Sequence, residues 1–154
     1  TYGYAPHPDD VADAVREYEK RLSSSCKLRN IEAKEEKPPE DPSASEVAAL
    51  LRKEGDRLLA ALPQKSYKIA LCIEGTELSS EELAAKLADI VVSGHSELTF
   101  IIGGAFGMDE RVKKAADFRL SVSRMTFTHR MMRVILTEQL YRAQNILMGG
   151  HYHK

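Results

Sequence analysis

The segment LTFIIGGAFG, residues 98–107, decides the fold of this chain. Its first five residues are typical of a buried strand and lead directly into a glycine turn, so the backbone bends sharply where the strand ends. In open α/β sheets ligands bind at this end of the strands, and glycine lets a ligand approach the main chain closely. A glycine turn between a strand and a helix also forms without a ligand, so the turn alone favours a structural role.

A second unit of the same kind follows. Residues 119–122 predict a strand, residues 123–128 predict a loop, and a long apolar pattern predicts a helix that begins near His129. Apolar residues cover too much of this helix for a single stripe, which indicates burial on more than one side. The two strand, loop and helix units are expected to stand side by side.

The rest of the chain continues the alternation of helices and strands. In the first half we expect a helix capped by Asp9 or Asp10 and ending near Leu22, a strand at 28–33, an exposed loop at 34–45 and a helix at 45–62. An apolar strand at 67–73 follows, with Cys72 in the core. The next helix is capped by Ser79 or Ser80, and its inward-facing residues are Leu83, Leu87, Ile90 and Val91. This order predicts an α/β fold, with a parallel sheet and helices on both of its faces.

Length and composition limit the class of protein. With 154 residues, 43% of them hydrophobic, the chain can bury one core, and we expect a single domain over residues 1–154. Two distant cysteines indicate neither a disulfide framework nor a zinc knuckle. We find no apolar run long enough to span a membrane and no signal peptide, so we expect a reduced, cytoplasmic protein.

The charge is unevenly distributed along the chain. Residues 1–100 carry 13 Lys and Arg against 19 Asp and Glu, whereas residues 101–154 carry 9 against 4. A basic segment around a glycine turn suits a polyanion, because Lys and Arg gain from contacts with phosphates and from the release of counterions. The asymmetry alone is modest evidence for a nucleic-acid partner.

Short motifs that recur across nearly the whole chain carry a specific resemblance. They are EYEKRL at 17–22, KEG at 53–55, Leu71 with Gly75, IGG at 102–104, the stretch from Leu120 to His129, MRV at 132–134, EQLYRA at 138–143 and YHK at 152–154. In this order they resemble the SPOUT class of methyltransferases, and within it the RlmH family, which methylates N3 of a pseudouridine in 23S ribosomal RNA. The resemblance implies a deep C-terminal trefoil knot, which no periodicity could reveal.

The resemblance also implies a cofactor and the positions that bind it. The cofactor would be S-adenosylmethionine, and the family's positions correspond to Leu71, Gly103 with Gly104, and the loop residues Val122, Ser123, Arg124, Met125, Thr126 and Phe127. The chemistry of these residues is consistent with that role. Main-chain groups of the loop can bond to the edges of adenine, while Leu71 and Phe127 can supply apolar walls.

Methyl transfer to N3 requires a group that takes the imide proton. His129 and His153 are the candidates for this base, with Tyr152 as an orienting group or donor, and the sequence does not choose between them. Arg142 could bind substrate or phosphate, but it also lies four residues after Glu138, the spacing of an ion pair within a helix. The resemblance implies a homodimer whose C-terminal tail completes the partner's site, acting on rRNA within the large subunit or the ribosome.

Two departures from the family keep an alternative open. The short apolar strand that precedes Gly3 in the family is absent from this sequence, and Thr128 stands where the family usually has proline before His129. Thr128 could loosen the loop, or its hydroxyl could cap the helix. The alternative is a protein of the same knotted fold that binds ribosomal RNA without methylating it.

Two histidine motifs could suggest a metal, but we expect no metal site. His7-Pro8-Asp9-Asp10 lacks the later HxxH that a zinc-dependent deacetylase needs, so we interpret it as a turn that caps a helix. The terminal His151-Tyr152-His153-Lys154 offers only two ligands on a chain end, which makes a weak site.

Overall fold

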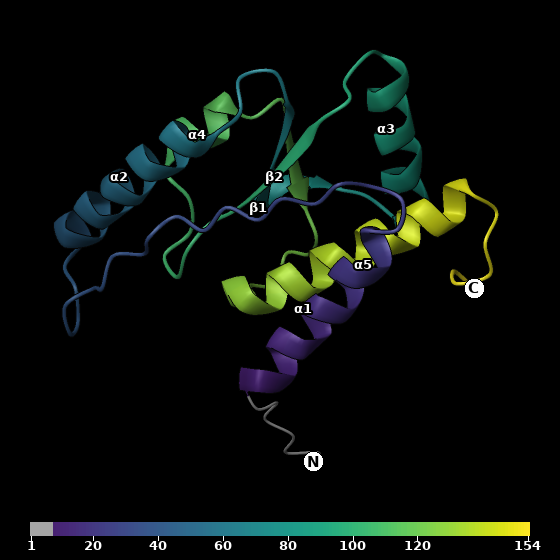
Figure 1. Cartoon of the computed structure of the whole chain (residues 1–154). Helices are drawn as coiled ribbons and strands as arrows, with labels where there is room; N and C mark the ends of the chain where they lie inside the picture. The colour runs from purple at the N-terminus through teal and green to yellow at the C-terminus, as the bar shows by residue number, and fades with distance from the viewer. Residues whose placement is uncertain (1–7) are drawn as a thin grey trace.

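The structure, a computed structural model, describes residues 8–154, with side chains from Asp10 onward. The interpretations of the region around Gly3 and of His7 concern positions outside the described residues. The elements in chain order are α1 (Pro8–Leu22), α2 (Ala44–Ala61), β1 (Tyr67–Glu77), α3 (Ser80–Val92), β2 (Leu98–Ile102), α4 (Glu110–Ala115), β3 (Phe118–Ser121) and α5 (His129–Leu147). Figure 1 shows a central sheet with α2 and α4 to one side, α3 to the other, and α1 crossing α5.

The three strands form one parallel sheet in the order β2-β1-β3, as the alternation predicted. Tyr67 of β1 is opposite Leu98 of β2, and Ile69 is opposite Phe118 of β3. The central strand continues to Glu77, beyond its expected end at residue 73, and its pairing with β3 becomes irregular between Leu71 and Thr76. The carboxyl ends of all three strands therefore meet at one edge of the sheet.

Helices cover both faces of the sheet, which confirms the prediction. Because successive side chains of a strand point to opposite faces, Ile69 and Leu71 enter one core and Ala70 enters the other. The first core contains Leu83 and Ile90 of α3, Leu120 of β3 and Leu136 of α5. The second contains Ile101 of β2 and Met108 and Val112 at α4, packed against Leu58, Leu59 and Leu62 at the end of α2.

The last helix packs against α1 as well as α3, so the expected burial on more than one side is confirmed. Leu136 faces the sheet and α3, and the rings of Tyr18 on α1 and Tyr141 on α5 lie 6.3 Å apart. Its first turn is capped by Thr128, whose Oγ1 accepts from the backbone N–H of Met131 at 3.3 Å. The capping role proposed for Thr128 is therefore confirmed.

Serine side chains begin two other helices. Ser79 caps α3, which decides between the two candidates, and Ser43 caps α2 through a reciprocal pair with Glu46. The second helix thus begins one residue before its expected start. The first helix begins at Pro8, so neither Asp9 nor Asp10 precedes it as a cap, and proline suits a first helical position because its missing N–H would have no partner there.

Three expectations about burial and strands were wrong. Residues 28–33 form no strand, because no neighbouring strand supplies backbone partners, and Leu28 and Ile31 remain exposed. Val91 is exposed at 54%, so it does not belong to the inward stripe of α3. Cys72 is only half-buried, because it points to the edge of the sheet where the strands end.

Candidate active site

A cavity lies at the carboxyl ends of the three strands, with a volume of about 160 Å³. The structure gathers there nine of the thirteen residues predicted for the site: Leu71, Gly103, Gly104, Val122, Ser123, Met125, Thr126, Phe127 and His129. Leu71 comes from the centre of the sheet, the glycines from the turn after β2, and the others from the loop between β3 and α5. The topology therefore brings together segments that are far apart in the sequence.

Close contacts within the glycine turn leave no space for a side chain at Gly103. A Cβ on Gly103 would lie 2.5 Å from the carbonyl oxygen of Gly107, and Gly107 itself has a φ of +95°. A side chain at Gly103 would therefore displace the turn itself. A Cβ on Gly104 would lie 3.1 Å from an oxygen of Glu54, which places α2 against the same turn.

Hydrogen bonds of two serines shape the loop after β3. The hydroxyl of Ser121 donates to the carbonyl of Ser123 at 3.0 Å, and Oγ of Ser123 accepts from the N–H of Met125 at 3.0 Å. Of the predicted cofactor positions 122–127, Arg124 is the one that does not line the cavity. Its side chain is 89% exposed and lies 3.9 Å from Glu77.

A polar wall that sequence reasoning missed consists of Cys72, Glu74 and Lys113. The ammonium of Lys113 donates to Glu74, which lowers the pKa of that carboxyl. Burial acts to lower the pKa of Lys113, but its bonds to Glu74 and Glu110 outweigh burial and raise it. Burial also raises the pKa of the Cys72 thiol, so it stays protonated at neutral pH. The sequence feature that could have indicated a role for Glu74 at the site is its position next to Gly75, one of the family's motif residues.

His129 is the one predicted proton acceptor that lines the cavity. Its Nε2 lies 3.0 Å from Oε1 of Glu35, a residue of the connection between α1 and α2. The imidazole is about one-third exposed, so it can reach both the cavity and a ligand from solvent. Sequence reasoning could not foresee this contact, because 94 residues separate its partners.

The other three predicted catalytic residues form a separate cluster. Tyr152 donates to Glu138 at 3.1 Å, and Arg142 pairs with the same carboxylate, as its spacing predicted. Arg142 also donates to Nδ1 of His153 at 3.2 Å, while Nε2 of His153 donates to Glu81 at 2.7 Å. Since α5 rises 1.5 Å per residue, Arg142 lies about 20 Å along the helix from His129. The tail therefore does not reach the cavity of its own chain.

The environment of Tyr152 makes it a donor rather than a base. Its hydrogen bond with Tyr18, at 3.3 Å, and its burial raise the pKa of Tyr152. The neighbouring carboxylate of Glu138 acts in the same direction. The phenol therefore remains protonated at neutral pH.

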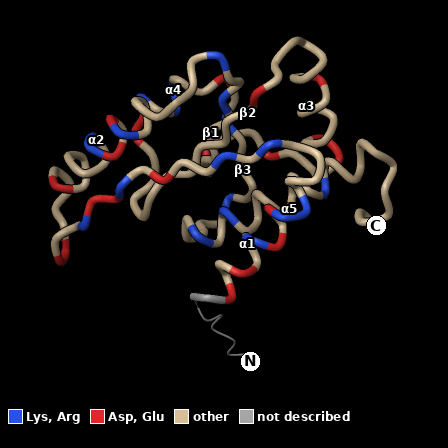
Figure 2. Tube along the Cα trace, viewed as in Figure 1, with Lys and Arg blue, Asp and Glu red and all other residues tan. Residues whose placement is uncertain are grey.

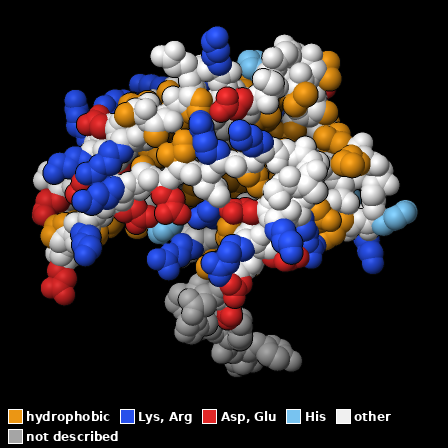
Figure 3. Space-filling model, in the orientation of Figure 1, with side chains coloured by type: hydrophobic (Ala, Val, Ile, Leu, Met, Phe, Trp, Pro, Cys, Tyr) orange, Lys and Arg blue, Asp and Glu red, His pale blue; other side chains and the backbone are white. Residues whose placement is uncertain are grey.

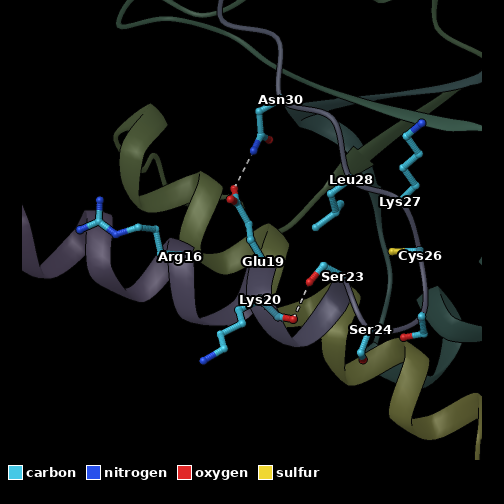
Figure 4. Close-up of a pocket in the computed structure, with 10 residues that line it drawn as sticks. Arg16, Glu19, Lys20, Ser23, Ser24, Cys26, Lys27, Leu28 and Asn30 are labelled. Atoms are coloured by element: carbon cyan, nitrogen blue, oxygen red, sulfur yellow. Dashed lines mark hydrogen bonds between the residues drawn. The ribbon is translucent and has the colours of Figure 1, made fainter.

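A second hollow on the surface lies between the end of α1 and residues 26–30 (Figure 4). Arg16, Lys20 and Lys27 surround it, while Glu19 accepts from the side-chain amide of Asn30 at 3.0 Å. None of the predicted site residues lines this hollow, and it is wide and shallow. We therefore place the candidate site at the sheet edge.

Two further observations concern metals and membranes. Among residues 8–154, no cluster of three or more His, Cys, Asp or Glu side chains is arranged to hold a metal ion. In the same described part of the chain, no helix combines the length and apolar character needed to cross a membrane.

Comparison with known proteins decides the family. A family model described as a predicted SPOUT methyltransferase matches residues 5–153. The chain belongs to the SPOUT methyltransferase family. In this chain the family's α/β fold has a three-stranded parallel sheet.

Several SPOUT relatives match over nearly their whole length. A ribosomal RNA large subunit methyltransferase H from Clostridioides difficile is 51% identical over 140 residues, covering 91% of this chain and 88% of the relative. A putative methyltransferase of the same name from Methanococcus maripaludis is 48% identical over 144 residues, covering 94% and 91%. A Bifidobacterium adolescentis protein of this name is 47% identical with the same coverage. These names agree with the RlmH resemblance.

Proposed function

We propose that this protein transfers a methyl group from S-adenosylmethionine to N3 of a pseudouridine in large-subunit ribosomal RNA. The main support for the proposal is the cavity at the strand ends, because most of the positions that the family resemblance assigns to the cofactor line it. Relatives with 47–51% identity are named ribosomal RNA large subunit methyltransferases. The corresponding residues of this chain line one cavity with a histidine at its rim.

The residues at the cavity fit the cofactor chemically. Leu71 and Phe127 offer apolar surface, the glycine turn and the loop at 122–127 offer main-chain groups, and Glu74 offers a carboxylate to hydroxyl or ammonium groups. The volume of about 160 Å³ is below the roughly 300 Å³ at the lower end of small-molecule sites. A molecule of cofactor size would therefore fill the cavity and extend over the exposed loop.

The chain's own residues must align the nucleophile and accept one proton. When bound, S-adenosylmethionine supplies a methyl carbon that its sulfonium already activates. N3 of pseudouridine is an imide N–H, so the enzyme must hold the ring in line and take its proton. His129 lines the cavity, and we propose it as the proton acceptor.

The separation of the two clusters supports a homodimer. Arg142, Tyr152 and His153 lie far from the cavity of their own chain, so they can serve catalysis only at another subunit's site. Exposed apolar side chains surround the cavity, and surfaces of this kind commonly form interfaces. They are Ile73, Phe106, Val122, Met125 and Phe127. We propose that a second copy covers this rim and brings its tail to His129.

We further propose the family's C-terminal trefoil knot within one domain that spans residues 1–154. The match to the SPOUT family supports the knot. In this chain α4 leads from one edge strand to the other across one face of the sheet, and α5 then packs on the opposite face. Stretching the chain from both ends should then give a contour length shorter than that of 154 extended residues. Reaching the full length would contradict the knot.

The proposed substrate places the protein in the cytoplasm with the ribosomes. The sequence offers no aromatic platform for single-stranded RNA, since only 6% of residues are aromatic. Large subunits or assembled ribosomes are therefore the expected partner.

Calorimetry with S-adenosylmethionine tests the cavity directly. Thr126 is exposed and lines the cavity, so Thr126→Trp should fill it without disturbing the core, and we expect affinity to fall at least about 10-fold. Gly103 is unsuitable for this purpose, because a side chain there would displace the turn. Lys65→Trp, at the opposite end of the strands, controls for the added ring and should bind normally. If Thr126→Trp and Lys65→Trp bound S-adenosylmethionine with equal affinity, the assignment of the cofactor to this cavity would be refuted.

A further inference from the structure

The strap, residues 32–36, lies beside the cavity and joins the first turns of α5 to α2. It belongs to the long connection that runs in front of the sheet from α1 to α2 in Figure 1. Glu32 pairs with Arg133 of α5 at 3.0 Å, one turn beyond His129. On the other side, Arg57 of α2 donates to the carbonyl of Lys34 at 2.8 Å and pairs with Glu36.

The second attachment of the strap reaches the glycine turn. The backbone N–H of Glu36 donates to Glu54 at 3.2 Å, and Glu54 is the side chain that approaches Gly104. Residues on both sides of Glu35 are thus fixed to different helices. Basic and acidic residues are interspersed along this connection in Figure 2, and the space-filling view of the same face shows both kinds of side chain at the surface (Figure 3).

Glu35 places a carboxylate oxygen 3.0 Å from Nε2 of His129. This close approach favours the neutral tautomer that carries its hydrogen on Nε2, because a carboxylate only accepts hydrogen bonds. In that tautomer the lone pair is on Nδ1, which has no partner among the described residues. His153 differs, because Arg142 and Glu81 occupy both of its ring nitrogens.

An exposed ion pair usually contributes little to stability. Here the strap holds the carboxylate in place at both ends, which is how supporting groups orient a functional side chain. The main effect of the contact is therefore to orient His129, and its contribution to the free energy of folding is small.

We propose that Glu35 is a positioning residue that fixes the Nε2–H tautomer and the orientation of His129, so that Nδ1 accepts the proton from N3 of the target. This inference rests on the proposed function. In the step, the N3–H bond breaks and the proton binds Nδ1, while the electron pair left on N3 forms the bond to the methyl carbon. The bond between that carbon and the cofactor's sulfonium sulfur would break at the same time, and its electron pair would go to sulfur, which leaves as a neutral thioether. The resulting imidazolium keeps Nε2–H on Glu35, whose negative charge stabilises it.

The test compares Glu35→Ala and Glu35→Asp with Glu40→Ala. Glu40 is an exposed glutamate of the same connection with no partner among the described residues, so its variant removes the same charge from the same segment. With large ribosomal subunits that lack the methyl group, Glu35→Ala should lower kcat about 10- to 100-fold, below the full contribution of a general base. KM for S-adenosylmethionine should change less than 2-fold, and Glu35→Asp should restore part of kcat.

Nitrogen-15 NMR on the histidines of the full chain gives a readout that needs no activity. At alkaline pH the imidazole is neutral, and a ring N–H is visible only if a hydrogen bond slows its exchange with water. His129 should show an Nε2–H signal in the wild type and Glu40→Ala, but not in Glu35→Ala. If the wild type transferred no methyl group at all, the proposed function would be refuted. The Nε2–H signal would still show whether Glu35 fixes the tautomer of His129.

Either of two results overturns the inference. One is a kcat of Glu35→Ala equal to that of Glu40→Ala while the wild type is active. The other is an Nε2–H signal of His129 that persists in Glu35→Ala.

Discussion

Gly75 shows how one residue without a side chain positions the strands beneath the site. A Cβ there would lie 2.8 Å from the backbone of Arg119 and Leu120, where β3 passes the irregular part of β1. Because backbone atoms cannot rotate away, we expect Gly75→Ala to destabilise the protein by about 1–3 kcal/mol. Urea unfolding followed by circular dichroism measures this change.

Gly94 supplies the control for that prediction. It has a φ of +107° and nothing within 4 Å of an added Cβ, so Gly94→Ala introduces backbone strain without a clash. We expect a cost of about 1 kcal/mol for Gly94→Ala, from backbone conformation alone. A Gly75→Ala variant that is as stable as the wild type would contradict the close approach of the strands.

At the scale of single residues, short-range rules predicted much of the site. Ser79 and Thr128 cap their helices because side-chain oxygens satisfy free N–H groups nearby in the chain. The pair of Arg142 with Glu138 follows from helical spacing. Contacts such as Glu35 with His129 depend on how distant segments meet, and no local pattern encodes them.

At the scale of elements, burial patterns predicted the three strands of the sheet and the faces of most helices. The expected strand at 28–33 failed for a reason that periodicity cannot detect. An extended segment becomes a strand only if a neighbour pairs with its backbone, and here the segment runs over the surface instead. The same segment leads into the strap, so its irregular path allows Glu35 to reach α5.

At the scale of the whole molecule, the proposed site needs two subunits. The cavity and His129 lie at the beginning of α5, whereas the tail cluster lies beyond its middle, about 20 Å away. Sequence motifs could name both groups but could not place them, because the distance depends on the tertiary fold.

Mixing two inactive variants tests the shared site. His129→Ala and His153→Ala should each abolish most activity, because each removes one half of every site. Random exchange of subunits in a two-fold dimer should restore about one quarter of wild-type activity, since half of the dimers carry one intact site. Activity of the mixture that remains at the average of the two variants would contradict a site built from both subunits, provided that light scattering shows a dimer.

The central claim is methyl transfer to one pseudouridine of the large subunit, and mass spectrometry of the RNA tests it most directly. Large subunits or ribosomes that lack the modification would be incubated with the protein and labelled S-adenosylmethionine, and the RNA then digested. We expect one labelled methyl group on N3 of a single pseudouridine, and slower labelling with Thr126→Trp when the cofactor concentration is close to the Kd of the wild type. Normal binding of the subunits without any transfer would contradict it and indicate a protein of this fold that binds ribosomal RNA without catalysis.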